Sequence, residues 1–140
     1  MITISTDKSR LDPSVIHHFL TYSYWAKDIP LENVEKRLKN ALCFGVYDGE
    51  NQIGFARVIS DYESFAYLAD VFILETHRGQ GLSKRLMETV FAHPDLQNLR
   101  RFMLATADAH GLYSQYEFQE LKNVDRWMEK VDLTVYQKRG

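Results

Sequence analysis

The 140-residue sequence predicts an α/β fold, in which about four helices flank a central mixed sheet of six to seven strands. Two observations predict it. Apolar periodicity gives the order strand, two helices, three strands, helix, strand, helix and one or two closing strands. A glycine-rich turn at residues 78–83 joins an apolar strand to a helix, and a helical crossover makes the strands on either side of it parallel. The length fits a single domain over residues 1–140.

The first two helices have clear boundaries. Residues 1–5 alternate in polarity, as in a short strand. Asp12 can cap the first helix, with Pro13 at the first helical position. Its expected apolar face is Val15, Ile16, Phe19 and Leu20, and that of the second helix is Leu31, Val34 and Leu38.

A hairpin and a buried strand are predicted in the middle of the chain. Residues 42–47 and 52–60 flank an Asp-Gly-Glu-Asn turn and should pair antiparallel. Residues 65–74 are apolar at nearly every position, which indicates a strand covered on both faces. The later elements are a helix over 81–91, a strand over 101–106, a helix over 107–116, and closing strands over 127–130 and 133–136.

The composition narrows the classes of partner and ligand to be expected. The net charge of −2 gives no basic excess, so a nucleic-acid partner is not expected. Cys43 is the single cysteine and lies in an apolar run, which favours a buried thiol and a reducing compartment. The histidines show no metal-ligand spacing. Without a signal-peptide core or a membrane-length apolar run, we expect a cytoplasmic protein with no membrane partner and no metal.

The turn Arg78-Gly79-Gln80-Gly81-Leu82-Ser83 is the strongest functional signal. A glycine turn before a helix can present backbone N–H groups, together with the positive end of the helix dipole, to an anion. The segment matches neither the phosphate-loop pattern nor the dinucleotide fingerprint. Taken alone, the segment is as consistent with a tight strand-to-helix corner as with an anion-binding site.

With the order of elements, two segments resemble the GNAT superfamily of N-acetyltransferases. Arg78-x-x-Gly81-x-Ser83 is similar to that family's pyrophosphate signature, with Ser83 in place of the final Gly or Ala. Thr106-x-x-Ala109-x-x-Leu112-Tyr113, followed by Glu117-Phe118, is similar to its second signature. There Thr106 stands where Asn is usual, and Glu117 where Gly is usual. The resemblance covers essentially the whole chain and implies a GNAT-like acyl-CoA N-acyltransferase fold.

The resemblance implies acetyl-CoA as co-substrate. Its pyrophosphate would rest on the amides of Arg78, Gly79, Gln80, Gly81, Leu82 and Ser83. Its pantetheine arm would lie along the fourth strand at Val71, Phe72 and Ile73, like an added strand where the fourth and fifth strands splay apart. Further cofactor contacts are implied at Thr106, Ala109 and Leu112.

The implied reaction is transfer of acetyl to a primary amine of a small molecule, peptide or protein by direct attack. Tyr113, carried over from the second signature, is the expected general acid for the departing thiolate; the alternative is a half-buried aromatic on a helix. Asp70 lies in an apolar strand where a carboxylate is costly unless paired. It is either a catalytic base or ammonium ligand, or a structural carboxylate paired with an arginine such as Arg57.

The acceptor side is less defined. Tyr22, Trp25 and Asp28, between the first two helices, could hold an amine by cation–π contact and charge. Asp61 and Glu63 lie in the turn before the fourth strand and could act through water, or be solvated turn residues. The acceptor itself cannot be read from the chain, and a homodimer is possible. The rival hypotheses are a non-catalytic acyl-CoA-binding sensor on the same fold and another nucleotide-binding α/β protein.

Overall fold

The computed structural model describes residues 1–137. The chain divides into two compact units, Met1–Ala105 and a second unit beginning at Thr106. Each is described by itself.

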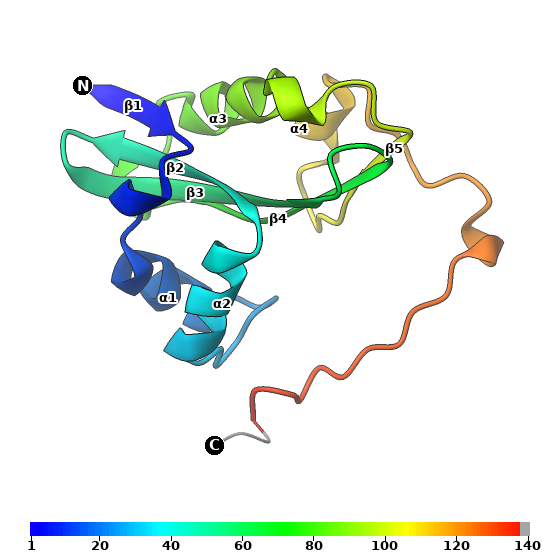
Figure 1. The fold of residues 1–140 in the computed structure, drawn as a ribbon, viewed down its shortest axis with the longest axis horizontal. Coiled ribbons are helices and arrows are strands. Elements are labelled where there is room, and N and C mark those ends of the chain that lie inside the picture. The colour runs from blue at the N-terminus through cyan, green and yellow to red at the C-terminus, as the bar shows by residue number, and fades with distance from the viewer. Residues whose placement is uncertain (138–140) are drawn as a thin grey trace. The chain divides into compact units, whose positions relative to one another are not determined.

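The first unit is built on a five-stranded sheet whose strands lie in chain order (Figure 1). The strands are β1 (Ile2–Ser5), β2 (Leu42–Asp48), β3 (Asn51–Ser60), β4 (Phe65–Ile73) and β5 (Arg101–Leu104). Neighbouring strands are antiparallel up to β4, and β5 runs parallel to β4, as predicted. The mixed α/β class is therefore confirmed.

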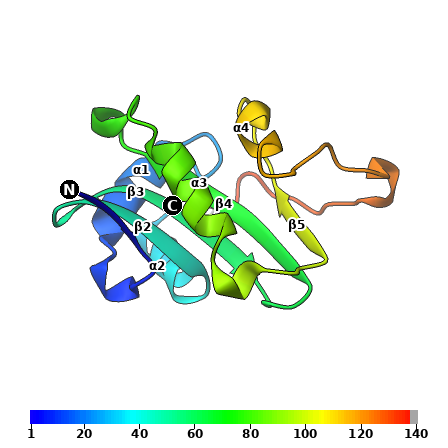
Figure 2. The same cartoon turned by 90° about the horizontal axis from the view of Figure 1, so that it is seen from above.

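Three helices cover the two faces of this sheet. Helices α1 (Pro13–Thr21) and α2 (Leu31–Lys39) lie on one face and α3 (Leu82–Phe91) crosses the other (Figures 1 and 2). The Asp12 carboxylate accepts from the amides of Ser14 and Val15, which confirms the predicted cap. The helices bury most of the expected apolar faces: Ile16, Leu20, Val34 and Leu38 on one side, and Leu82, Leu86, Met87 and Val90 on the other. Val15 and Phe19 are half-buried, and Leu31, predicted on the face of the second helix, is 42% exposed.

Strand β4 carries a bulge opposite β3. Phe55 pairs with Phe72 and Arg57 pairs with Ala69, so two β4 residues oppose one β3 residue. Asp70 is one of the two and has φ +55°, in the left-handed region where such a bulge usually takes glycine. The bulge twists the strand beside the glycine turn and re-aims its side chains.

The second unit holds α4 (His110–Ser114) and a 3-10 turn at Val124–Arg126. The predicted closing strands at residues 127–130 and 133–136 are wrong, since no strand is assigned to either segment. A strand needs a neighbour that accepts and donates its backbone hydrogen bonds, and β-type side chains alone do not supply one. The described chain accordingly has five strands, not six to seven.

Candidate functional site

The glycine turn presents a row of backbone donors. Gly79 and Gly81 have φ +80° and +73°, and Gly81 caps the start of α3. Within the described chain, the amides of residues 79–83 donate no hydrogen bond to protein. A Cβ built on either glycine would meet nothing within 4 Å, so space is open above the turn. Five adjacent N–H groups at a helix start are able to donate to an anion.

Arg78 anchors this turn with its side chain. Its Nε donates to the carbonyl of Ile73, the last residue of β4, over 3.0 Å. The Arg78 guanidinium is thus engaged by the strand, while the amides of the turn are open. The main-chain N–H groups of the turn are therefore available to a ligand, whereas Nε of Arg78 already donates to Ile73.

Strand β4 also has an open main-chain edge next to the turn. β5 pairs with β4 only from Phe65 to Leu68. Beyond Leu68, residues 69–73 have a strand partner on the β3 side alone within the first unit. Val71, Phe72 and Ile73 lie on this stretch, so an extended amide-containing ligand could add to it as a strand.

Asp70 forms a buried ion-pair cluster. Its carboxylate accepts from Arg57 Nε over 2.7 Å and from Arg37 Nη1 over 2.9 Å, and its side chain is 2% exposed. Both guanidinium groups contact this carboxylate, so its lone pairs are engaged by the ion pairs and not directed toward a substrate. The geometry therefore favours the paired-carboxylate interpretation over the catalytic base.

Trp25 brings the predicted acceptor loop onto this cluster. Its Nε1–H donates to Asp70 Oδ1 over 2.9 Å. On the same side, Phe19 of α1 stacks on Phe72 of β4, next to the bulge, with ring centroids 4.1 Å apart and planes 9° from parallel. Helix α1, through Phe19, and the loop after it, through Trp25, thus each contact the bulged strand.

An aromatic groove lies beside this junction. It encloses about 320 Å³ and is lined by His18, Phe19, Tyr22, Ser23, Tyr24 and Trp25. Tyr22 is 80% exposed and Trp25 is 42% exposed, so both present ring surface to a ligand. Of the predicted acceptor residues, Tyr22 and Trp25 are brought together here. Asp28, with φ +65°, does not line the groove; its amide donates to the carbonyl of Thr21.

Asp61 is engaged by its own turn. Hydrogen bonds from the Ser64 hydroxyl, then from the amides of Glu63, Ser64 and Phe65, hold the pKa of Asp61 well below its usual range. A carboxylate satisfied in this way is a weak base, which favours the turn-residue interpretation. Glu63 is exposed in the same turn.

The predicted acid, Tyr113, lies in the second unit. Burial raises the pKa of its phenol above the ordinary value of about 10, and its ring contacts Phe118 edge-on. In the same unit the Thr106 hydroxyl accepts from the amide of Ala109, so Thr106 organises the turn into α4. Leu112 and Tyr113 follow within that helix.

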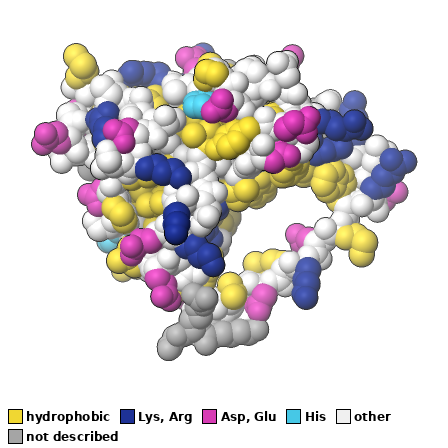
Figure 3. All heavy atoms as spheres, in the orientation of Figure 1, with side chains coloured by type: hydrophobic (Ala, Val, Ile, Leu, Met, Phe, Trp, Pro, Cys, Tyr) yellow, Lys and Arg dark blue, Asp and Glu magenta, His cyan; other side chains and the backbone are white. Residues whose placement is uncertain are grey.

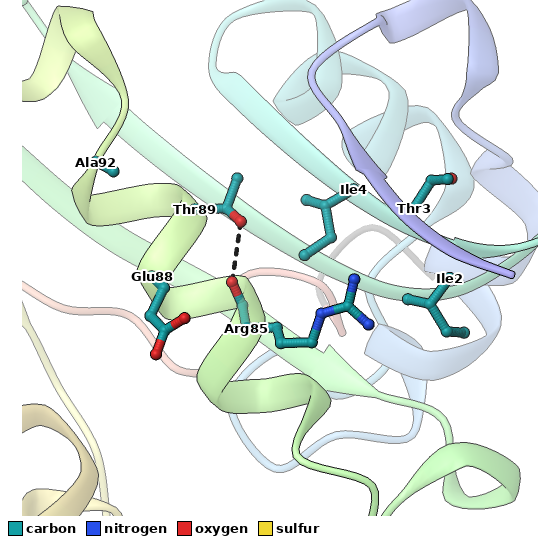
Figure 4. Close-up of a pocket in the computed structure, with 7 residues that line it drawn as sticks. All are labelled: Ile2, Thr3, Ile4, Arg85, Glu88, Thr89 and Ala92. Carbon is teal, nitrogen blue, oxygen red and sulfur yellow. Dashed lines mark hydrogen bonds between the residues drawn. The ribbon is translucent and has the colours of Figure 1, made fainter.

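A second hollow lies away from the predicted residues. It encloses about 580 Å³ between β1 and α3, and is lined by Ile2, Thr3, Ile4, Arg85, Glu88, Thr89 and Ala92 (Figure 4). The Arg85 side chain extends toward Ile2 and Ile4. None of the residues predicted to bind cofactor or acceptor contributes to it.

Cys43 is a buried free thiol. Burial raises the pKa of the Cys43 thiol to about 11, which suits a structural thiol rather than a nucleophile. Over residues 1–137, no three His, Cys, Asp or Glu side chains gather closely enough to hold a metal ion. No helix in that range is long and apolar enough to span a membrane.

Sequence reasoning missed two residues of the site. Arg37 follows Val34 on α2, and a single charge beside an apolar stripe was the available signal for a buried ion pair. Phe19 was predicted only as core, whereas its ring covers Phe72. Both contacts join segments distant in sequence, and periodicity within one element carries no information on them.

The chain thus combines a mixed sheet, a bulged fourth strand and a glycine turn with open amides at a helix start. The model of the Acetyltransferase (GNAT) family matches residues 10–118. The chain therefore belongs to the GNAT acetyltransferase family.

Individual proteins similar to this chain are also described as acetyltransferases. A crystal structure of a GNAT-family putative acetyltransferase from Xanthomonas campestris pv. campestris is 52% identical, with a TM-score of 0.94, and covers 97% of this chain and 96% of its own. A curated putative acetyltransferase of Gibberella zeae is 29% identical over 133 residues, covering 80% of this chain and 75% of its own. An acetyltransferase structure from Clostridium acetobutylicum, solved with acetyl-CoA, is 14% identical with a TM-score of 0.65, and covers 94% of this chain and 96% of its own.

Proposed function

We propose that this protein is an N-acetyltransferase that moves the acetyl group of acetyl-CoA to a primary amine. The observation that carries the proposal is the row of unengaged amides over residues 79–83, at the start of α3 and next to the open edge of β4. A pyrophosphate bound by the amides and an amide-bearing arm along the edge of β4 would match the chemistry of acyl-CoA.

The cofactor-side residues have distinct tasks in this proposal. The amides of residues 79–83 bind the pyrophosphate, and Arg78 holds the turn against β4 through the Ile73 carbonyl. Val71, Phe72 and Ile73 offer main-chain groups to the arm, and an amide near Phe72 is placed to donate to the oxyanion. Acetyl-CoA, when bound, supplies an activated thioester.

In this proposal, Tyr113 is the general acid. The amine must attack in its neutral form, with a free alkylamine pKa of about 10.4. Tyr113 then donates its proton to the departing sulfur, and a phenol whose pKa is raised by burial stays protonated over the physiological range. Asp70 acts as a positioning residue, because its carboxylate is committed to Arg37 and Arg57.

The acceptor is a small-molecule or peptide amine in our proposal. Tyr22 and Trp25 in the aromatic groove provide ring faces suited to an ammonium group or an apolar substituent. Trp25 also touches Asp70, so the groove is coupled to the bulge where the acetyl group would lie.

The deciding experiment measures thiol release from acetyl-CoA over a panel of primary amines, with Tyr113→Phe alongside. Turnover with at least one amine, reduced in the variant, is the expected result. Tight CoA binding without turnover, unchanged by Tyr113→Phe, would establish the sensor alternative instead. Stabilisation by ATP or NAD, without any by acetyl-CoA, would overturn the cofactor assignment.

A further inference from the structure

Arg57 of β3 has two guanidinium nitrogens that its ion pair with Asp70 does not use. Its Nε donates to Asp70 Oδ2 over 2.7 Å. Within the part of the chain that the structure describes, Nη1 and Nη2 of Arg57 donate to no other residue. Among the same residues, the phenol oxygen of Tyr47 is the only buried side-chain polar atom that lacks a hydrogen-bond partner. Nη1 and Nη2 are therefore reached by solvent, or by a ligand that replaces it.

The place of Arg57 on β3 explains this access. Because side chains alternate along a strand, Phe55, Arg57 and Ile59 share one face of the sheet. It is the face of α1, since Phe55 pairs with Phe72, which stacks on Phe19. Phe55 is fully buried, the Arg57 side chain is 12% exposed, and Ile59 is 43% exposed. Arg57 thus lies where this face changes from covered to open.

Arg57 also lies beside the expected reacting centre. It pairs with Ala69 across the ladder between β3 and β4, one residue before the bulge at Asp70. The Cβ atoms of directly paired residues are about 5 Å apart. Ala69 ends at its Cβ, so it is too short to cover a guanidinium group. Phe72, near which the acetyl group is proposed to lie, follows three residues later.

The charges around Arg57 favour an anionic ligand. The single carboxylate of Asp70 is shared by Arg57 and Arg37, so it balances at most one of the two positive charges. The last turn of α2 adds Lys36 and Lys39, and Lys and Arg side chains gather over this helix in Figure 3. A guanidinium group with two adjacent donors matches the two oxygens of a carboxylate.

We propose that the acceptor is a small amino acid, whose carboxylate binds Nη1 and Nη2 of Arg57 while its amine attacks the acetyl group. The inference rests on the proposed acetyl transfer and names the class of acceptor. The amine nitrogen bonds to the acetyl carbon and loses one proton to solvent. The C–S bond breaks with its electron pair on sulfur, and Tyr113 protonates the sulfur and regains a proton from solvent. The products are an N-acetyl amino acid and CoA.

The test compares each amino acid with its own carboxamide. CoA release gives kcat/KM over a panel of α-, β- and γ-amino acids and their amides. At least one amino acid should exceed its amide by about 10-fold or more, because the amide cannot accept charge-assisted hydrogen bonds from Arg57 as a carboxylate does. The amide has the more acidic ammonium group and so the larger neutral fraction, which by itself would favour the amide.

Substitution of Arg57 should remove this preference. Arg57→Gln should bring the ratio of the two kcat/KM values close to one. Arg57→Lys should lower the ratio without abolishing it, because lysine keeps the charge but not the paired donors. The ratio is taken within one variant, so a smaller folded fraction affects both substrates equally. Arg10→Gln, whose guanidinium group lies 4.1 Å from the ring centroid of Tyr47, is the control and should keep the wild-type ratio.

Calorimetric titration of the same amino acids in the presence of CoA separates this inference from the proposed reaction. Binding that Arg57→Gln weakens about 10-fold or more, without turnover, would support the carboxylate site and refute acetyl transfer. Turnover in which every amide equals or exceeds its amino acid would refute the carboxylate site and leave acetyl transfer standing. The carboxylate site is also overturned if both Arg57 variants keep the wild-type ratio, or if no amino acid binds or reacts.

Discussion

The indole of Trp25 donates a hydrogen bond to the carboxylate of Asp70 over 2.9 Å, across 45 residues of sequence. It joins the exposed loop between α1 and α2 to the buried bulge of β4. A change in either element is therefore transmitted to the other.

We expect Trp25→Phe to lower the free energy of unfolding by about 2 kcal/mol, since a hydrogen bond to a charged group is lost. The Michaelis constant for the amine should rise while the CoA dissociation constant stays within about twofold. Urea denaturation and steady-state kinetics measure the two effects. Tyr24→Phe, which removes one hydroxyl from an exposed neighbouring side chain, is the control for the free energy of unfolding. An equal loss of stability in that control would contradict the coupling.

Asp70→Asn should lower the free energy of unfolding by about 3 kcal/mol, because two partly buried guanidinium groups lose the charge of the carboxylate they share. Thermal denaturation checks this, with the exposed Glu63→Gln as a control expected to melt with the wild type. If Asp70→Asn kept the wild-type melting temperature but lost most of its turnover number, Asp70 would be the base after all.

Gly81→Asp should raise the CoA dissociation constant more than tenfold, since a carboxylate would stand at the expected phosphate position. Arg78→Ala should have a smaller effect, because its side chain holds Ile73. Isothermal titration calorimetry measures both. Gly49→Ala is the matched control: its φ of +61° carries a similar backbone penalty of about 1 kcal/mol, far from the turn. Equal, negligible effects at positions 78 and 81 would rule out the phosphate site.

Tyr113→Phe should lower the turnover number about 100-fold with little change in CoA affinity, as expected for loss of a general acid. Burial raises the folded-state pKa of Tyr113, so its protonated form is favoured on folding. Its contribution to stability is complete below about pH 10 and is lost as pH rises through the folded-state pKa. The variant should therefore be less sensitive to alkaline denaturation, with the exposed Tyr62→Phe as control. A turnover number within twofold of the wild type would remove Tyr113 from the mechanism.

Glu117→Gly should stabilise the protein by about 1 kcal/mol. Glu117 has φ +71°, where a side chain is strained and glycine is not. Glu120→Gly, at a position with ordinary φ, should not stabilise. Chemical denaturation compares the two. A loss of stability in Glu117→Gly would mean that the glutamate side chain outweighs the strain.

The elements with local signals were predicted well. The Asp12 cap, the hairpin around Gly49 and the helix after Gly81 each depend on residues close together in sequence, and all are found. The departure at Glu117 also has a local reason, because the chain there adopts the conformation that glycine favours.

The parts that depended on distant partners were not predicted. The sequence around Asp70 predicts neither its left-handed torsion inside a strand nor its ion pairs, whose arginine partners lie on α2 and β3. The closing strands failed for a related reason: β-type side chains at residues 133–136 have no neighbouring strand in the described chain.

Asp70, at the β4 bulge, combines two properties: a left-handed backbone torsion and a carboxylate paired with two arginines. Asp70→Gly would relax the backbone torsion but remove the carboxylate that pairs with Arg37 and Arg57. Asp70→Glu would keep the charge, but its longer side chain would fit the torsion less well. Neither property can be improved without loss of the other. Sequence variation at this position should therefore be limited to changes that also alter Arg37 and Arg57, and stabilising the protein by substitution at position 70 alone should fail.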